Sequence, residues 1–209
     1  MNIFENISKQ EKNELQKCLQ AVLKSYKKDE IIFNADEKVS CIYYVQEGVV
    51  ELIKDDLNGN EIIIGRIFEN ETFAESFVCT QTPSMVCAKA LTDTKILMLN
   101  FNRILNICSN SCPFHKKLLK NLLKIIAFKN IHLQTRLELL SKKTLRERIL
   151  CLLSKYKKST DSEIFEIPYS REKMAQFLGA NRSALSRELS KLKNENLIDY
   201  HFNSFKINL

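Results

Sequence analysis

The chain has 209 residues, which gives room for one large or two modest domains that each bury a core. Its net charge is +7, and residues 141–209 carry six of the surplus positive charges. This local excess fits a polyanionic partner, although a solvated basic surface would show the same charge. No apolar run is long enough to span a membrane and no N-terminal stretch resembles a signal peptide, so we expect a cytoplasmic protein.

The seven cysteines are irregularly spaced, which favours reduced thiols over a disulfide framework. A C-x3-C-x2-H pattern runs from Cys108 through Cys112 to His115. Because Pro113 interrupts any common helical face and no fourth ligand is evident, we predict no metal site there. Two roles are open for Cys112, a redox switch at the start of a helix or a small apolar filler.

Residues 1–28 mix apolar and charged side chains at helical spacing, so we expect an amphipathic helical lead-in. From residue 30 to about 100 the sequence consists of short runs rich in β-branched and aromatic residues: EIIF, SCIYYV, VVELI, EIIIGRIF, MVCAKAL and KILML. LNGN at 57–60 resembles a hairpin turn, with Gly59 available for positive φ. Strands at this spacing predict a small antiparallel roll or barrel of the size of a sensor domain.

The period becomes helical again after Phe101, and Pro113 suits the first turn of a helix that runs to about Leu140. Apolar residues recur along this helix at alternating steps of four and three, which is a coiled-coil seam. The seam comprises Leu119, Leu123, Ile126, Asn130, Leu133, Leu137 and Leu140. A second stripe beside it comprises Leu118, Leu122 and Ile125. We expect the second stripe to pack on the helix's own domain and the seam to join a second chain, with the lone Asn setting the register. A helix buried wholly within one chain is the alternative.

The C-terminal third begins with an amphipathic helix over residues 144–156, followed by a polar loop and a brief strand at 164–167. Two short helices then follow. Ser170 and Asn181 are placed to cap them, and Gly179 ends the first. The second buries Leu185, Leu189 and Leu192 on one stripe and turns Arg and Ser side chains outward.

Two helices with a tight turn between them are typical of the helix-turn-helix that enters a major groove. The alternative is an ordinary helical hairpin with a solvated basic face. After the second helix, Asn196 stands where positive φ is usual, and the chain alternates around Asn203-Ser204 as a β-hairpin does. A hairpin in this position predicts a winged helix.

The order of β-roll, long helix and winged helix resembles the Crp/Fnr family of bacterial transcription regulators across essentially the whole chain. MAQFLGANRSALSRELSKLKNENLI, residues 174–198, is the most specific match, and YYVQEGVVELIKDDLNGNE, residues 43–61, is similar to the family's β-roll. The resemblance implies an α+β chain with an antiparallel β-roll (a double-stranded β-helix) in residues 1–112, a central dimerisation helix in 113–140 and a winged helix-turn-helix in 141–209. It also implies a homodimer on a palindromic double-stranded DNA site, with RNA polymerase as a further partner if the protein is an activator.

The resemblance places the family's base-reading positions at Arg182, Ser183, Ser186 and Arg187. Because a guanidinium fork matches O6 and N7 of guanine, we expect Arg182 and Arg187 to read bases directly, with phosphate or surface roles as the alternative. Many members have Glu where this chain has Ser183, so the family's familiar operator is not expected. Ser170 and Lys193 are the expected phosphate contacts.

Members that bind cyclic AMP use a Gly-Glu-Leu run and an Arg-Ser pair that holds the cyclic phosphate. The corresponding residues are Ala74-Glu75-Ser76 and Thr82-Pro83, so the carboxylate is retained and the phosphate anchor is not. The Thr-Ser pair that contacts adenine is replaced by Leu133-Gln134. A buried phosphate without its Arg would lose the contacts that offset its desolvation, so cyclic AMP in the usual mode is not expected.

Two alternatives remain: the protein binds another, apolar or weakly polar, effector, or it binds none. Its expected pocket comprises Phe73, Ala74, Glu75, Ser76, Thr82, Pro83, Leu123 and Ala127. Relatives that carry an iron–sulfur cluster use closely spaced N-terminal cysteines, and this chain has only Cys18 there, so we expect no cluster.

Two other functions were compatible with a β-roll. A metal enzyme of the cupin type needs His ligands inside the strands, but His115, His132 and His201 lie outside them, so we predict no catalytic residues. A ligand-binding module that acts on a protein partner would not need the helix-turn-helix. We therefore predict a sequence-specific transcription regulator whose β-roll senses an unidentified signal, with an effector-independent regulator or such a module as alternatives.

Overall fold

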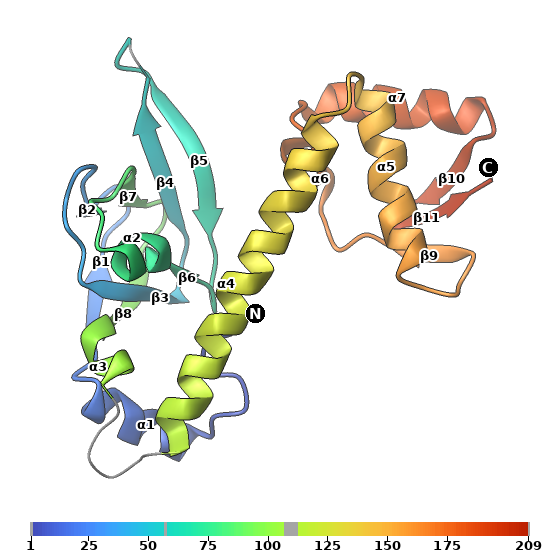
Figure 1. Cartoon of the computed structure of the whole chain (residues 1–209). Helices are drawn as coiled ribbons and strands as arrows, with labels where there is room; N and C mark the ends of the chain where they lie inside the picture. Colours follow the sequence, from blue (N-terminus) through green and yellow to red (C-terminus); the bar gives the residue numbers. More distant parts are fainter. Residues whose placement is uncertain (1, 57, 107–112, 209) are drawn as a thin grey trace. The chain divides into compact units, whose positions relative to one another are not determined.

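The computed structural model describes residues 2–56, 58–106 and 113–208. They form two compact units, Met1–Phe128 and Lys129–Leu209. Antiparallel sheets in the first unit, the long helix α4 (Pro113–Leu140) and a helix-turn-helix in the second confirm the predicted fold class (Figure 1). The expected domain limits at residues 112 and 140 stay a prediction.

The described part of the first unit contains two four-stranded antiparallel sheets, with strand orders β1-β8-β3-β6 and β2-β7-β4-β5. The strands are β1 (Val22–Tyr26), β2 (Ile31–Phe33), β3 (Cys41–Glu47), β4 (Val50–Asp55), β5 (Glu61–Ile67), β6 (Thr72–Phe73), β7 (Cys87–Ala90) and β8 (Thr94–Asn100). All six predicted runs became strands. The β4–β5 turn has Gly59 at φ +78°, as expected.

The interior of the roll is filled by aromatic side chains. Phe33, Tyr43 and Phe73 are at most 6% exposed, and their ring centroids lie 5.0–6.0 Å apart. Ring pairs at this separation add to the free energy gained from burial. Short β-branched strands thus close over a core supplied mainly by their inward-facing rings and by Val and Ala.

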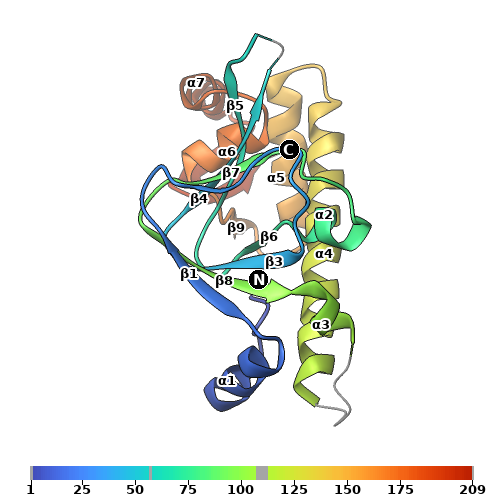
Figure 2. The same ribbon diagram turned by 90° about the vertical axis from the view of Figure 1, so that its left-hand side faces the viewer.

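The prediction of a helical segment over residues 1–28 is wrong for the second half of that range. Helix α1 (Lys9–Cys18) begins with a capping box between Ser8 and Glu11, but Val22–Tyr26 is strand β1. That strand pairs along β8, from Val22 opposite Met98 to Tyr26 opposite Thr94, and the two run side by side in Figure 2. Pairing with a strand some 70 residues later outweighed a weak local helical pattern.

The second apolar stripe of α4 is buried, as predicted. Leu118, Leu122 and Ile125 are 0–4% exposed and join a core with α1 and the outer side of β8 and β3. Asn121 on the same face donates to the backbone oxygens of Ile3 (2.9 Å) and Glu5 (2.8 Å). These contacts attach the first half of α4 to its own unit. Short helices α2 (Glu75–Thr80) and α3 (Phe101–Leu105) complete the unit.

The second unit contains the end of α4 and a winged fold of three further helices. Its elements are α5 (Leu145–Lys158), β9 (Ile164–Glu166), α6 (Arg171–Phe177), α7 (Arg182–Asn194), β10 (Ile198–His201) and β11 (Ser204–Ile207). The strands form a sheet in the order β10-β11-β9. The hairpin turn lies at Phe202-Asn203, one residue earlier than expected, and Asn196 has φ +59° as predicted.

Candidate nucleic-acid interface

The helix-turn-helix forms because both helices carry their own start signals. The backbone N–H of Lys173 donates to Ser170 Oγ (3.2 Å), and that of Ala184 donates to Asn181 Oδ1 (2.8 Å). Each cap satisfies an N–H that has no partner within the helix. Gly179 between the helices has φ +65°, a conformation in which glycine carries no steric penalty.

Burial of one leucine stripe orients α7. Leu185, Leu189 and Leu192 are 0–1% exposed and pack in the core of the second unit. Side chains on the opposite face therefore point to solvent. All four predicted base-reading residues are exposed there: Arg182, Ser183, Ser186 and Arg187.

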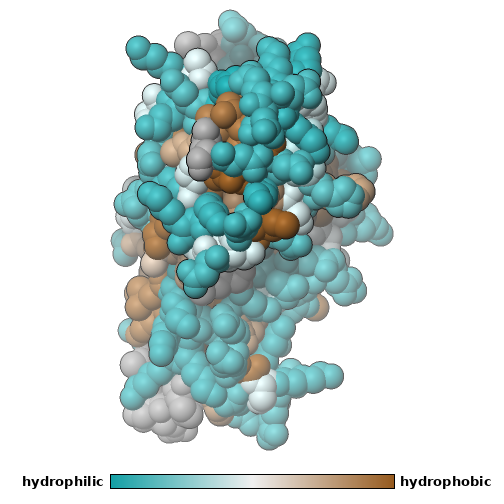
Figure 3. Space-filling model, turned by 90° about the vertical axis from the view of Figure 1, so that its right-hand side faces the viewer, coloured by the Kyte–Doolittle hydropathy of each residue, from teal (hydrophilic) through white to brown (hydrophobic). Residues whose placement is uncertain are grey.

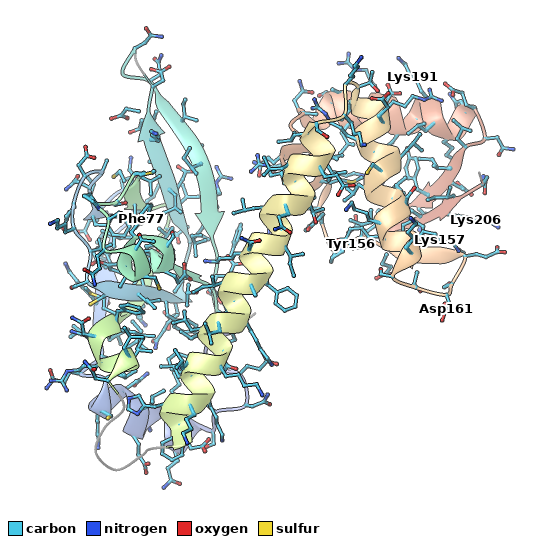
Figure 4. The ribbon with its side chains drawn as sticks, in the orientation of Figure 1. Phe77, Tyr156, Lys157, Asp161, Lys191 and Lys206 are labelled. Carbon is cyan, nitrogen blue, oxygen red and sulfur yellow. The ribbon has the colours of Figure 1, made fainter. Side chains whose placement is uncertain are left out.

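The charges around α7 separate into paired and unpaired cations. Arg146 of α5 donates to both carboxylate oxygens of Glu195, and Lys191, labelled in Figure 4, lies 3.9 Å from Glu188. Within the described residues, neither Arg182 nor Arg187 has an ion-pair or hydrogen-bond partner. Glu188 of α7 and Glu195 directly after it are thus engaged by other cations, and the N-terminal half of α7 presents two available guanidinium groups.

The two predicted phosphate contacts differ in how they are held. Lys193 Nζ lies 2.6 Å from Asp199 Oδ1 and 5.3 Å from the centre of the Tyr200 ring. This contact raises the pKa of Lys193 and lowers that of Asp199. Ser170 is exposed. Its hydroxyl oxygen accepts the hydrogen bond from the Lys173 N–H that caps α6, and its own O–H can still donate to a phosphate. Lys193 must leave Asp199, or share it, to bind a phosphate.

Two positioning residues were not predicted from the sequence. Arg146 ties α5 to the end of α7 through Glu195, as described above. Arg148 Nη1 donates to the Leu178 carbonyl (3.1 Å) and its Nε donates to the Lys142 carbonyl (3.1 Å). An Arg-x-Arg pair on an amphipathic helix has no local signature for the contacts with Leu178 and Glu195, because these two partners lie 30 and 49 residues away.

The predicted seam of α4 is exposed over most of its length. Leu123, Leu133 and Leu137 are 61%, 57% and 69% exposed, and Ile126 is 38% exposed. Leu119 and Leu140 are half-buried, and Asn130 is exposed. The face shown in Figure 3 is largely hydrophilic, with separate hydrophobic patches. An exposed row of leucines on one helix is costly in water and is typical of an interface.

The residues of the expected effector pocket lie at three places. Phe73, Ala74 and Glu75 are at most 7% exposed, and Thr72 Oγ1 donates to the Glu75 carboxylate. Thr82 lines a separate hollow of about 310 Å³ with residues of α2 and α3, while Ser76 and Pro83 are exposed. Leu123 and Ala127 line a groove of about 480 Å³ whose lining residues all belong to α4. A single shared pocket stays a prediction.

The remaining cysteine and histidine candidates are only partly described. Cys108 and Cys112 lie outside the described residues. His115 is 2% exposed, and its Nε2 lies 3.9 Å from Cys18 Sγ. No group of three or more His, Cys, Asp or Glu side chains within the described residues is arranged to hold a metal ion. None of the helices described here combines the length and the apolar character needed to cross a bilayer.

Two family models match the chain. Residues 23–111 match the cyclic nucleotide-binding domain, and residues 147–208 match the Crp-like helix-turn-helix domain. The chain belongs to the Crp/Fnr family. Like relatives that are named as transcription regulators, this Crp/Fnr protein is a DNA-binding transcription regulator.

Curated relatives of this Crp/Fnr protein are distant. The transcriptional activator protein FnrL of Cereibacter sphaeroides is 24% identical over 190 residues, covering 84% of this chain and 71% of that protein. The ycf28 protein of Porphyra purpurea, named as an HTH-type transcriptional regulator, is 26% identical over 170 residues, covering 78% and 68%.

Solved structures show the same fold. The catabolite activator protein of Thermus thermophilus has a TM-score of 0.57 at 21% identity, covering 99% of this chain and 93% of that one. A CooA mutant of Carboxydothermus hydrogenoformans has a TM-score of 0.61 at 18% identity, covering 100% and 92%.

Proposed function

We propose that the protein acts as a homodimer that reads a palindromic DNA site with Arg182 and Arg187, under the control of a signal sensed by its β-roll. The observation that carries this proposal is the pair of exposed arginines on α7 that have no partner within the described residues. By contrast, the nearby cations Arg146, Lys191 and Arg148 are engaged by carboxylates or carbonyls. A guanidinium without a local partner is available to donate two hydrogen bonds to a guanine.

The dimer is supported by the exposed seam of α4. Leu123, Leu133 and Leu137 are each more than half exposed, whereas the stripe beside them is buried. Pairing two seams removes these leucines from water, and Asn130 at a seam position favours one register of two chains. Two reading heads related by a two-fold axis require half-sites about one helical turn apart.

Cyclic AMP in the family's usual mode does not fit the residues of the roll. Glu75, the carboxylate that is retained, is buried and accepts a hydrogen bond from Thr72. However, the position of the phosphate-binding Arg is taken by Thr82, whose hydroxyl lies 2.8 Å from Thr80 Oγ1. With Phe33, Tyr43 and Phe73 packed inside the roll, the proposed effector is a small apolar or weakly polar molecule.

We propose no catalytic activity, metal or iron–sulfur cluster for the chain. The cytoplasm is the proposed location, and RNA polymerase is the proposed further partner if the protein activates transcription. The transcriptional activator FnrL among its relatives supports that last role.

Selection from a pool of random duplexes at moderate salt tests the DNA-binding proposal. The full-length chain should enrich one palindromic motif with half-sites about 10–10.5 base pairs apart. Equal binding to all sequences would overturn sequence-specific reading by Arg182 and Arg187. Enrichment of a single half-site would overturn the dimer.

A thermal melt of the full-length chain against a library of small metabolites tests the sensor. A ligand that binds only the folded chain raises the melting temperature. That ligand should change the affinity for the selected duplex by the same factor by which the duplex changes the affinity for the ligand. A ligand that raises the melting temperature without changing DNA affinity would overturn the coupling.

A further inference from the structure

The tip of the wing carries the most exposed large apolar side chain of the described residues. Phe202 is 79% exposed and forms, with Asn203, the two-residue loop between β10 and β11. The His201 ring lies against it edge-on, with ring centroids 4.6 Å apart. An aromatic side chain at the end of a hairpin gains little from burial within its own fold.

The backbone at Phe202 is also unfavourable for its residue type. Its φ is +49°, whereas Asn203 has no positive φ. In a two-residue hairpin loop, positive φ at the first position alone is the pattern of a type II′ turn, which prefers glycine there. A bulky residue in this region is strained. Neither packing nor turn chemistry therefore accounts for a phenylalanine at this position.

Arg171 holds this turn in place. Its Nη2 donates to the Phe202 carbonyl (2.6 Å), and its Cζ lies 5.0 Å from the ring centres of both Tyr200 and Phe205. The Ile167 N–H donates to the Asn203 carbonyl (3.0 Å) from the other side. The tip is thus fixed against the N-terminal end of α6.

Residues of α6 and the start of α7 line a common surface hollow. A polar hollow of about 420 Å³ lies between the two helices, with Glu172 and Gln176 on one side and Asn181 and Arg182 on the other. Arg171 is the neighbour of Glu172 on the first turn of α6. Through Arg171, the wing tip therefore lies beside the first turn of α6, and that turn lines the hollow together with Arg182.

We infer that Phe202 is a DNA contact whose ring packs on deoxyribose rings in the minor groove beside the major groove that α7 enters, and that Arg171 is the positioning residue that presents it. Phe has no donor for a phosphate, whereas proteins that bind the minor groove use Phe and other apolar side chains there. The inference rests on DNA binding by α7 and does not require the dimer.

Three variants of Phe202 and one matched control test this inference in the full-length chain. Phe202→Gly and Phe202→Ala remove the ring, and Phe202→Tyr keeps it. Ile164→Ala truncates another apolar side chain of the same sheet, 60% exposed on β9. Dissociation constants are measured at several salt concentrations on the duplex selected by the wild-type chain and on an unrelated duplex of equal length.

We expect Phe202→Gly and Phe202→Ala to bind both duplexes about tenfold more weakly, with an unchanged slope of log K against log salt, because no charge is lost. Phe202→Tyr and Ile164→Ala should bind like the wild type. Hydroxyl-radical footprints of Phe202→Gly should lose protection of the minor-groove sugars flanking each half-site. The melting temperature of Phe202→Gly should not fall, since glycine suits the turn.

Wild-type affinity in Phe202→Gly would overturn the inference, and would leave the tip free for a protein partner. A smaller salt slope in that variant would also overturn it, by assigning the loss to a phosphate contact. An equal loss in Ile164→Ala would overturn it as well, because the loss would then come from a general effect on the wing. A wild-type chain that binds both duplexes equally would refute sequence-specific reading, while the comparison at Phe202 would still stand on the unrelated duplex.

Discussion

Lys193 Nζ lies 2.6 Å from Asp199 Oδ1 and joins the recognition helix α7 to the first strand of the wing. Both side chains are about half exposed or more, so the pair adds little to the stability of the fold. We propose that its main consequence is for DNA binding, because the carboxylate would compete with a DNA phosphate for the same ammonium group.

We expect Asp199→Asn to strengthen DNA binding and to steepen the dependence on salt by about one phosphate contact. The substitution releases Lys193 and removes a negative charge near the polyanion. Glu163→Gln, which breaks the ion pair with Lys206 (2.9 Å) in the same sheet, serves as control and should change the slope less. Filter-binding or anisotropy titrations over a salt series measure both. An unchanged slope in Lys193→Ala would remove Lys193 from the phosphate contacts.

Arg187→Ala should cost about 1–3 kcal/mol at one base pair in each half-site, because a bidentate contact to guanine is lost. Lys158→Ala, at the C-terminal end of α5, removes the same charge at an exposed site and should lower affinity only through net charge. Competition binding with single-base variants of the selected duplex makes the measurement. A loss that is uniform over all variants would assign Arg187 to phosphate.

Leu137→Glu should convert the dimer to a folded monomer. Leu137 is 69% exposed within one chain, so a carboxylate there disturbs no core of that chain but would be buried in the paired seam. Ile131→Glu is the matched control, because Ile131 is similarly exposed (57%) on another face of α4. Sedimentation velocity measures the association state, and far-UV circular dichroism checks folding. Dimers of Leu137→Glu, or monomers of Ile131→Glu, would contradict the assigned seam.

Gly179→Ala should destabilise the second unit more than its backbone strain alone explains. Gly179 has φ +65°, and a Cβ there would lie 2.8 Å from Leu140 Cδ2. Gly59→Ala is the control, since Gly59 has φ +78° but no described atom lies within 4 Å of its Cβ position. The difference between the two, about 1 kcal/mol or more, reports the cost of overpacking. Urea unfolding followed by circular dichroism measures both, and equal losses would show that Leu140 moves aside freely.

Stability of the second unit should fall in mild acid through His132. Its ring lies 4.7 Å from the Phe177 ring, its Nε2 is 3.4 Å from the Tyr169 hydroxyl, and burial and the nearby charge of Arg136 lower its pKa from 6.5. A lowered pKa means that the unfolded chain takes up the proton first. The stabilisation is thus present above pH 6.5 and is lost as the pH falls from there through the lowered pKa.

Thermal melts between pH ~5 and ~8 check the role of His132. His132→Phe keeps an aromatic ring against Phe177 and removes the titrating group, so its melting temperature should change less across this range. Equal pH dependence in the wild type and the variant would assign the effect to other groups.

Local sequence signals were enough to predict the helices of the DNA-binding unit. Ser170 and Asn181 cap the helices that their positions predicted, and the stripe from Leu185 to Leu192 is buried. These features depend on residues three or four apart, so they can be recognised without the rest of the chain. The exposure of Arg182 and Arg187 follows from the same periodicity.

Contacts between residues far apart in the sequence decided the features that were not predicted. Strand β1 exists because residues 22–26 pair with β8, and the two-residue strand β6 is too short for a sequence signal. The partners of Arg146, Arg171 and Lys193 lie in elements brought together only by the tertiary fold.

The sequence by itself therefore determined the order of most elements, the helix-turn-helix and the family, because periodicity, caps and a local motif carry that information. Only the tertiary structure decided which cations are already paired and which remain available to DNA. It also showed that Phe202 stands exposed on a strained turn. Ion pairs and exposure depend on neighbours distant in sequence, and no local pattern encodes them.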